Sequence, residues 1–207
     1  MTKIEWKKTE PWYSTRKKAR ILTLPDQHYF LIDGLGDPNQ ADFAQHVQTL
    51  YPLSYAIRMS YRNDWEIDGY QEYTVYPLQG HWSIQEQYLN QTPMKKDYFK
   101  YTIGIKQPEF VTAAVAEKAK QRAAEKVDAA LLKQVRFETI KGKQVSQILH
   151  VGPFDEEPVS FAKLEDYLKT EGYQRVSHEH DEIYLSDPRK TAPEKMKTIL
   201  QVEIKLV

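Results

Sequence analysis

The stretch VSQILHVGPFDEEPVSFAKLEDYLKTEG, residues 145–172, decides the fold that we predict from this sequence. Its first eight residues are typical of a strand that ends at Gly152, and FDEE forms an acidic loop. A helix follows, for which Asp155 is the predicted N-cap, Pro158 suits the first turn and Gly172 is the stop signal. The apolar stripe of this helix consists of Phe161, Leu164 and Leu168.

The same order of elements occurs in the first half of the chain. There a predicted strand, HYFLIDG (28–34), leads to a predicted helix, ADFAQHVQTLYPL (41–53), which we expect Pro52 to kink or divide. The remaining predicted strands are YQEYTVYPL (70–78) and YFKYTIGIKQP (98–108) in the first half, and HDEIYLSDP (180–188) and TILQVEIKLV (198–207) in the second. Strand, helix, strand, strand therefore occurs twice.

An Ala-rich segment, 108–134, separates the two halves and is predicted to be one connecting helix. The repeat predicts an α+β fold of two pseudo-symmetric strand-helix-strand-strand units, about 21–107 and 135–207, in a single domain that spans residues 1–207. Each unit would place its helix on one face of a sheet. Joining the units would form a saddle whose opposite faces enclose a ligand cleft between the sheets.

Composition excludes several classes of protein. The chain has 29 basic and 29 acidic side chains, so no overall charge draws it to nucleic acid or to a membrane surface. The absence of Cys excludes a disulfide scaffold, a thiolate metal site and a cysteine nucleophile. No apolar run reaches the length of a membrane span, and no signal-peptide pattern is present. We expect a cytoplasmic protein that uses no cofactor.

The first 20 residues carry a local excess of positive charge, with seven basic and two acidic side chains. No nucleic-acid-binding motif follows them, so we expect a solvated lead-in rather than a nucleic-acid arm. The segment is also too short for a helix-turn-helix, and direct binding of nucleic acid is not expected.

Aromatic residues make up 12% of the chain and include 14 Tyr and 4 Trp. Tyr and Trp combine a large apolar face with a polar edge, which suits a wet ligand cavity as well as a core. Both interpretations stay open for any single one of them.

Glu182 stands inside the predicted strand 180–188, where a carboxylate needs a reason. Side chains alternate along a strand, so Ile183 and Leu185 share one face while Glu182 and Tyr184 share the other. We expect the apolar pair to pack against the helix and Glu182 to face the cleft. Aromatic surroundings would raise the pKa of this carboxyl and make it a general base or acid. Alternatively it stays ionised and attracts a cationic ligand, or it is an edge carboxylate in solvent or paired with Lys or Arg.

The residues beside Glu182 include candidate metal ligands. His178 and His180 form an H-x-H pattern beside Asp181 and Glu182, and on a strand the two His could share a face. No third ligand stands at a recognisable spacing, so we expect a loop before the strand and no metal site. The Ser, Asp and His residues show no nucleophile-elbow pattern, which argues against a serine-hydrolase triad.

With these residues laid out, the chain resembles the stand-alone GyrI-like (gyrase-inhibitor-like) small-molecule-binding proteins over nearly its whole length. Five ordered segments carry the resemblance: FLIDGLGDPN (30–39), YTVYPLQGHW (73–82), KQPEFV (106–111), QILHVGPFDEEP (147–158) and HDEIYLSDPRKTAPEKMKTIL (180–200).

The resemblance implies a paired strand-helix-strand-strand fold with a ligand cleft, and Glu182 matches a central Glu around which relatives bind bulky, often cationic aromatics. Some stand-alone relatives hydrolyse the cyclopropane ring of DNA-alkylating natural products. By that likeness Glu182 would orient or deprotonate a water, while a Tyr hydroxyl stabilises the phenolate oxygen of the product.

The resemblance also bears on the ligand-binding residues. Gln79 replaces a carboxylate that is frequent at this position in the family, which leaves Glu182 as the principal charged group. Trp82 is the expected stacking wall. The other expected ligand-binding aromatics are Tyr184, Tyr61, Tyr70, Tyr73, Tyr76 and Phe154.

The resulting hypothesis is a protein that binds planar apolar xenobiotics and hydrolyses those that carry a cyclopropane ring, which would detoxify them. The alternative is a non-catalytic protein that sequesters or senses aromatic cations. The oligomeric state stays open.

Overall fold

One antiparallel sheet organises residues 3–207, which are the residues that the computed structural model describes. Its strand order is β1-β6-β9-β8-β3-β4-β2-β5, and β7 pairs with β9. The strands are β1 (Arg20–Thr23), β2 (Gln27–Leu35), β3 (Leu78–Ile84), β4 (Phe99–Gln107), β5 (Arg136–Ile140), β6 (Gln144–Val151), β7 (Tyr173–Arg175), β8 (His180–Tyr184) and β9 (Lys197–Leu206). The helices are α1 (Trp6–Thr9), α2 (Ala41–Arg58), α3 (Ala113–Ala123), α4 (Ala129–Gln134) and α5 (Glu157–Glu171).

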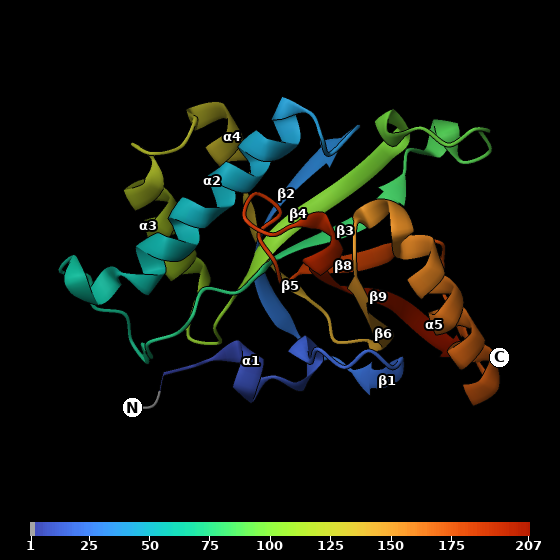
Figure 1. Ribbon diagram of the computed structural model, residues 1–207. Helices are drawn as coiled ribbons and strands as arrows, with labels where there is room; N and C mark the ends of the chain where they lie inside the picture. Colours follow the sequence, from blue (N-terminus) through green and yellow to red (C-terminus); the bar gives the residue numbers. More distant parts are fainter. Residues whose placement is uncertain (1–2) are drawn as a thin grey trace.

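The sheet is pseudo-symmetric about the junction of β8 and β3. On one side lie β3, β4 and β2 with helix α2, and on the other β8, β9 and β6 with helix α5, so each unit runs strand, helix, strand, strand along the chain. Pairing of β3 with β8 joins the two sheets edge to edge into one. The helices α2 and α5 flank these central strands (Figure 1). The predicted α+β fold of two units is confirmed.

Helix α2 is continuous from Ala41 to Arg58, so the expectation that Pro52 divides it is wrong. Proline removes one intrahelical hydrogen bond and crowds the preceding turn. Leu50, Leu53 and Ile57 are all fully buried against the sheet on either side of this position. Their packing stabilises the helix across the proline, because most helical stability in proteins comes from burying one face.

Helix α5 ends as predicted, with Gly172 in the left-handed conformation at φ 76°. Its start differs from the prediction. Phe154–Glu156 forms a short 3-10 turn, and Glu156, not Asp155, occupies the N-cap position without a side-chain cap. The turn uses the segment that the sequence indicated as an acidic loop.

Two sequence-based element assignments are wrong. Of the predicted strand 70–78, residues 70–77 do not form a strand: Tyr73 makes an isolated bridge to Ile4, and β3 begins at Leu78. Their Tyr and Val side chains pack into the core from an irregular segment, which mimics the composition of a strand. The segment 108–134 contains two helices, because the Asp128 side chain caps α4 by accepting hydrogen bonds from the amides of Ala130 and Leu131.

The N-terminal segment is not a solvated lead-in. Trp6 and Tyr13 are buried in the main core, and the indole nitrogen of Trp6 donates a hydrogen bond of 3.0 Å to the carbonyl of Val75. Between these two aromatic residues Lys7, Lys8, Thr9 and Pro11 are exposed. The many basic residues of this segment indicated a solvated chain, although Trp6 and Tyr13 pack in the core. Among residues 3–207, none of the helices has the length and apolar character that crossing a membrane requires.

Candidate functional site between the two helices

The two faces of the sheet differ in what covers them. Trp82 of β3 stacks on Phe43 of α2, with ring centroids 5.8 Å apart, and its cross-strand neighbour His180 meets Phe161 of α5 at 4.9 Å. Cross-strand neighbours point to the same side of a sheet. Both long helices therefore lie on one side, which we call the helix face. The opposite side is called the back face.

Alternation along β8 is as predicted, but the assignment of its two faces is wrong. Glu182 pairs with Gly80 and stands two residues after His180. Side chains two residues apart on a strand point to the same side, so Glu182 and Tyr184 lie on the helix face with His180. Ile183 lies on the back face. The reason is topological: antiparallel pairing of β3 with β8 places both helices on one side, and the helix face between them receives the polar side chains.

Glu182 is 8% exposed in spite of its charge. Its Oε1 lies 3.1 Å from Nε2 of His180, two residues earlier on the same side of β8. Donor atoms of Glu182, His180 and Glu157 lie within 4.8 Å of one another. Glu157 comes from the first turn of α5, so strand and helix together bring two carboxyl groups into one buried cluster.

Glu157 is 7% exposed, and its Oε1 is buried without a hydrogen-bond partner. Burial, the negative charge of Glu182 and a hydrogen bond with it raise the pKa of Glu157 to about 9. At neutral pH this carboxyl therefore carries a proton beside Glu182. Glu157 was not predicted from the sequence, although it stands four residues before Phe161 and so continues the apolar stripe of α5.

Tyr184 and Trp82 form the adjoining side of the cluster. The indole nitrogen of Trp82 donates a hydrogen bond of 2.8 Å to the Tyr184 hydroxyl. Burial, and then the charge of Glu182, raise the pKa of Tyr184 well above its ordinary value, so it stays a phenol. Gly80 makes room for both: a Cβ there would lie 2.7 Å from the Trp82 nitrogen and 3.0 Å from the Tyr184 oxygen.

An aromatic wall extends from Trp82 towards α2. Its ring also meets Tyr101 at 5.4 Å and Phe99 edge-on at 5.8 Å, and Tyr101 is linked to His46 by a hydrogen bond of 3.1 Å. On the other side Phe154, which is 38% exposed, meets Tyr184 edge-on at 6.0 Å. The buried carboxyl pair is thus bounded by aromatic rings, and one of them reaches the surface.

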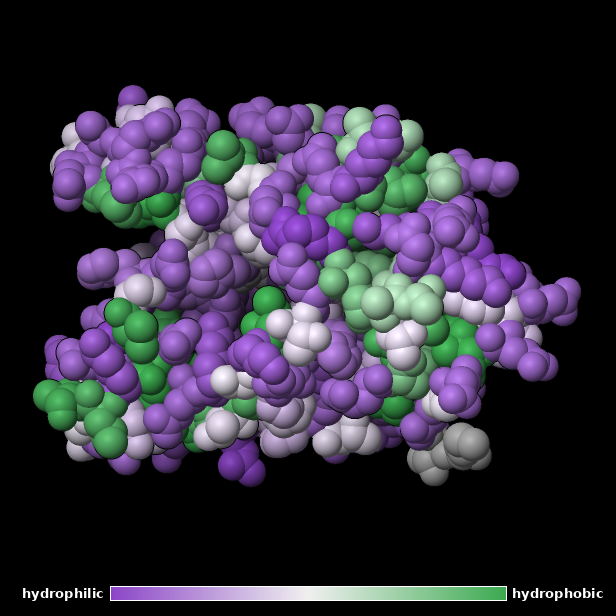
Figure 2. All heavy atoms as spheres, turned by 180° about the vertical axis from the view of Figure 1, so that it is seen from behind, coloured by the Kyte–Doolittle hydropathy of each residue, from purple (hydrophilic) through white to green (hydrophobic). Residues whose placement is uncertain are grey.

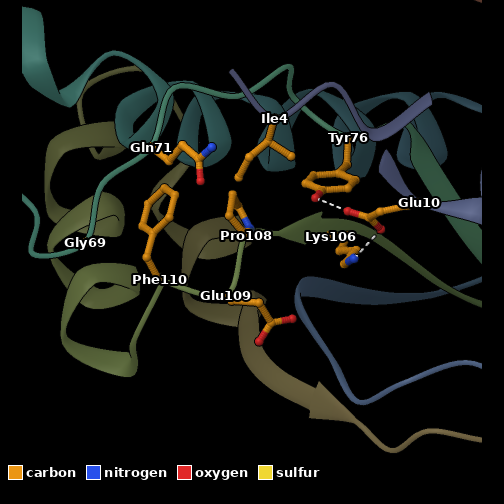
Figure 3. A pocket seen from close by; sticks show the side chains of 9 residues that line it. All are labelled: Ile4, Glu10, Gly69, Gln71, Tyr76, Lys106, Pro108, Glu109 and Phe110. Atoms are coloured by element: carbon orange, nitrogen blue, oxygen red, sulfur yellow. Dashed lines mark hydrogen bonds and ion pairs between the residues drawn. The ribbon is translucent and has the colours of Figure 1, made fainter. Parts of the chain in front are cut away.

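Five of the predicted ligand-binding residues lie elsewhere. Tyr61 and Tyr70 pack together near the end of α2, and Tyr73 donates a hydrogen bond to the carbonyl of Ser54. Tyr76 lies on the back face, where its hydroxyl donates a hydrogen bond to Glu10 (the bond is drawn in Figure 3). Gln79 is on the back face, where it contacts the hydroxyls of Tyr29 and Tyr13. The predicted residues that the structure brings together are Glu182, Tyr184, Trp82 and Phe154.

The three donors Glu157, His180 and Glu182 are of the types that bind divalent metal ions, and Glu157 supplies the third donor that the sequence pattern lacked. The proton on Glu157 already offsets the charge of the carboxyl pair.

The chain as a whole is similar to one family of domains and to several solved structures. The profile of the GyrI-like small molecule binding domain matches residues 17–205. A structure from Listeria innocua described as a hydrolase is 35% identical with a TM-score of 0.88, and the match covers 99% of this chain and 100% of that one. A second Listeria innocua structure, described as an uncharacterized conserved protein, is 36% identical with a TM-score of 0.88, over 98% of this chain and 100% of that one.

A more distant match is the C-terminal domain of EcmrR, with a TM-score of 0.53 and 12% identity over 92% of this chain and 98% of that one. At that identity the likeness shows a common fold alone. Curated proteins include no significant match to this chain.

Proposed function

The chain belongs to the GyrI-like small-molecule-binding domain family, and from this membership we propose that the cluster around Glu182 binds planar apolar xenobiotics and hydrolyses those that carry a cyclopropane ring. The observation that carries the proposal is the carboxyl pair. Glu182 supplies a charged carboxylate, and Glu157 beside it supplies a proton at neutral pH.

Binding uses the aromatic wall. A planar ligand that displaces Phe154 outward would stack against Tyr184 in its place, beside the hydrogen-bonded Trp82. Offset stacking on such rings contributes about 0.5 to 1.5 kcal/mol per pair beyond the burial of apolar area. The reacting carbon would then lie beside Glu182, in surroundings from which most water is excluded.

The reaction needs a nucleophile and a proton donor, and the pair offers both. Water attacks a ring methylene as Glu182 takes its proton, and the strained C–C bond breaks. The electron pair of that bond moves into a conjugated carbonyl, whose oxygen becomes a phenolate. Glu157 gives its proton to this oxygen, and the Tyr184 hydroxyl supports the developing charge.

The catalytic cycle closes within the pair. After the reaction Glu182 holds the proton from water and Glu157 is ionised. Transfer of one proton from Glu182 to Glu157 restores the starting state, and the net change is the addition of one water to the substrate. The hydrolase description of the Listeria innocua relative, at 35% identity over nearly the whole chain, supports a hydrolytic role.

A second candidate function is the binding of aromatic cations without chemistry. The charge of Glu182 within a set of aromatic rings favours it, since a cation over such rings gains about 0.5 to 2 kcal/mol. In that function Glu157 would release its proton when a cation binds, because the added positive charge favours the ionised pair.

Hydrolysis is tested by incubating the protein with a spirocyclopropane that is conjugated to a dienone, and following the water-addition product by mass spectrometry. Glu182→Gln should reduce the rate by about 10² to 10⁴-fold while the protein still binds the substrate. Glu156→Gln, a change at the exposed neighbour of Glu157, is the matched control and should retain the rate.

Stoichiometric binding without any water-addition product in the unmodified protein would refute the hydrolase proposal. The cation-binding function is tested separately, by titrating a cationic aromatic dye and a neutral molecule of the same shape. Equal affinities of the two would remove the charge-pairing role from Glu182.

A further inference from the structure

The back face of the sheet contains a cavity of about 330 Å³. Seen from behind, the molecule is hollowed near the middle, with mainly hydrophilic residues around the hollow (Figure 2). The cavity volume lies at the lower end of the range found for small-molecule sites, about 300 to 1,000 Å³. Neither Glu182 nor Glu157 lines it, so it is separate from the cluster on the helix face.

The floor of the cavity is a chain of buried polar side chains. The Tyr29 hydroxyl lies 2.8 Å from Oε1 of Gln27 and 3.1 Å from Oε1 of Gln79, and Nε2 of Gln79 donates to the Tyr13 hydroxyl at 3.0 Å. The Tyr13 hydroxyl satisfies the amide nitrogen of Gln79, and the single proton of the Tyr29 hydroxyl is shared between the amide oxygens of Gln27 and Gln79. These contacts leave the amide nitrogen of Gln27 buried without a partner.

That unpaired donor points to a missing acceptor. Gln27 is 5% exposed and lines the cavity. Buried polar atoms are paired in the great majority of cases, because an unmade hydrogen bond in the interior costs about 1 to 3 kcal/mol. An acceptor atom brought into the cavity would complete the chain of hydrogen bonds.

Trp12 forms an aromatic wall of the same cavity. Its indole nitrogen donates to Oε2 of Glu10 at 2.8 Å, and Nζ of Lys106 lies 2.5 Å from the same oxygen. Figure 3 shows Glu10 between Lys106 and Tyr76, both of which bond to it. The polar edge of Trp12 is therefore occupied, and Nζ of Lys106 lies 5.2 Å from its ring centroid. The rest of the apolar ring remains to contact a ligand.

The charged groups of the cavity are already paired. Each cationic side chain of the lining lies within 4.0 Å of a carboxylate, and a charged ligand would have to disrupt one of these pairs. The pairs are Arg136 with Asp33 and Glu138, Lys141 with Asp26, Lys143 with Asp181 and Glu203, and His81 with Asp181 and Glu179. Charge therefore favours a neutral ligand.

We propose that the back-face cavity is a second ligand site, for a neutral planar molecule with a carbonyl or ring-nitrogen acceptor that takes a hydrogen bond from Gln27 and packs on Trp12. Apolar side chains complete the enclosure, namely Leu24, Leu31 and Ile183. The site does not depend on the reaction proposed for Glu182.

The test uses coumarin and naphthalene, two planar neutral molecules of similar size, of which only coumarin has a carbonyl acceptor. Binding is followed by NMR through the side-chain amide signals of Gln27, assigned by their loss in Gln27→Leu, and through the indole N–H signal of Trp12, which lines the same cavity and is retained in Gln27→Leu. Coumarin should bind more tightly than naphthalene and shift these signals. Gln27→Leu should lower the affinity for coumarin by about tenfold, close to that for naphthalene, and leave naphthalene binding unchanged.

Two further variants separate this site from the helix face. Trp12→Ala should weaken both probes, and Glu182→Gln should leave the coumarin shifts at Gln27 unchanged. Unchanged naphthalene binding by Gln27→Leu also shows that this variant is folded. Equal affinity for the two probes, coumarin binding that shifts no Gln27 signal, or no saturable binding because water alone fills the cavity, would each overturn the proposal.

Discussion

Replacing Glu157 with Gln should stabilise the protein at neutral pH and make its stability less dependent on pH. Burial and the charge of Glu182 raise the pKa of Glu157 from 4.5 to about 9 in the folded state. In the unfolded chain the same carboxyl loses its proton freely. At neutral pH the chain must therefore take up a proton on Glu157 when it folds, and this uptake lowers the free energy of unfolding.

Proton linkage gives the sign and the size of the effect. Between its two pKa values the folded state binds one proton more than the unfolded state, so the free energy of unfolding falls by about 1.4 kcal/mol for each pH unit. Neutral pH lies about 2.5 units above the ordinary pKa of Glu157, which gives a cost of about 3 kcal/mol. A Gln side chain has nearly the same volume and still donates a hydrogen bond to Glu182, so the variant avoids this cost.

The assay is urea unfolding followed by Trp fluorescence at a series of values from about pH 5 to about pH 9. The difference between Glu157→Gln and the unmodified protein should be smallest at the acid end and widen as the pH rises. Glu156→Gln, at an exposed position, should show no such widening. Parallel curves for Glu157→Gln and the unmodified protein would refute the claim that the buried carboxyl holds a proton.

Three other predictions concern the surrounding structure. Gly80→Ala should lower both stability and ligand affinity, measured by thermal unfolding and dye titration, because its Cβ would displace the side chains of the aromatic cluster. Glu10→Gln should destabilise the fold by about 3 to 5 kcal/mol in urea unfolding by leaving Lys106 buried without its partner, and the added change Lys106→Met should restore most of the loss. Asp181→Asn should cost most stability between about pH 4 and pH 6.5. Burial alone would raise the pKa of Asp181, but the hydrogen bond from His81 holds that pKa below 3.8. The stability that this bond gives the folded state is lost as the pH falls through the pKa of Asp181. The same bond raises the pKa of His81 above 6.5, and the stability that this gives is lost as the pH rises through the raised value. A difference in urea midpoint that is no larger at about pH 5 than at about pH 3 and about pH 9 would contradict the pairing.

The sequence predicted the two-unit fold because each unit carries local signals of its own. The strand that ends at Gly152 and the helix stop at Gly172 are encoded within a few residues of where they act. The strand predicted at 70–78 failed because Tyr and Val favour strands and cores alike, and in that segment tertiary packing determined the conformation.

The candidate site was predictable in part. Alternation identified Glu182 and Tyr184 as neighbours on one side of a strand, but it cannot tell which side the helices cover. That choice depends on how the second unit joins the first, which is a long-range property. Glu157 was missed because a carboxylate on an apolar stripe has no local explanation, and its partner stands 25 residues further along the chain.

The tyrosines at 61, 70, 73 and 76 show the limit of composition as a guide. Their amphipathic rings suit a ligand cavity, yet Tyr70, Tyr73 and Tyr76 pack with the core under α2 and beside the N-terminal segment, and Tyr61 is exposed beside Tyr70. Each hydroxyl with a buried position finds a partner, as the bond from Tyr70 to the carbonyl of Arg58 illustrates. The number of Tyr residues therefore did not distinguish those that pack in the core from those that lie beside the candidate site.

The shared strand β8 also constrains how such a protein can change over evolutionary time. Asp181 and Ile183 serve one side of the sheet, while Glu182 and Tyr184 serve the other. Single substitutions can therefore modify either side alone, so the two can diverge independently. Inserting or deleting one residue within the strand would exchange the two sets of side chains at once. Variation within this strand should consequently be found in residue identity, with its length held constant.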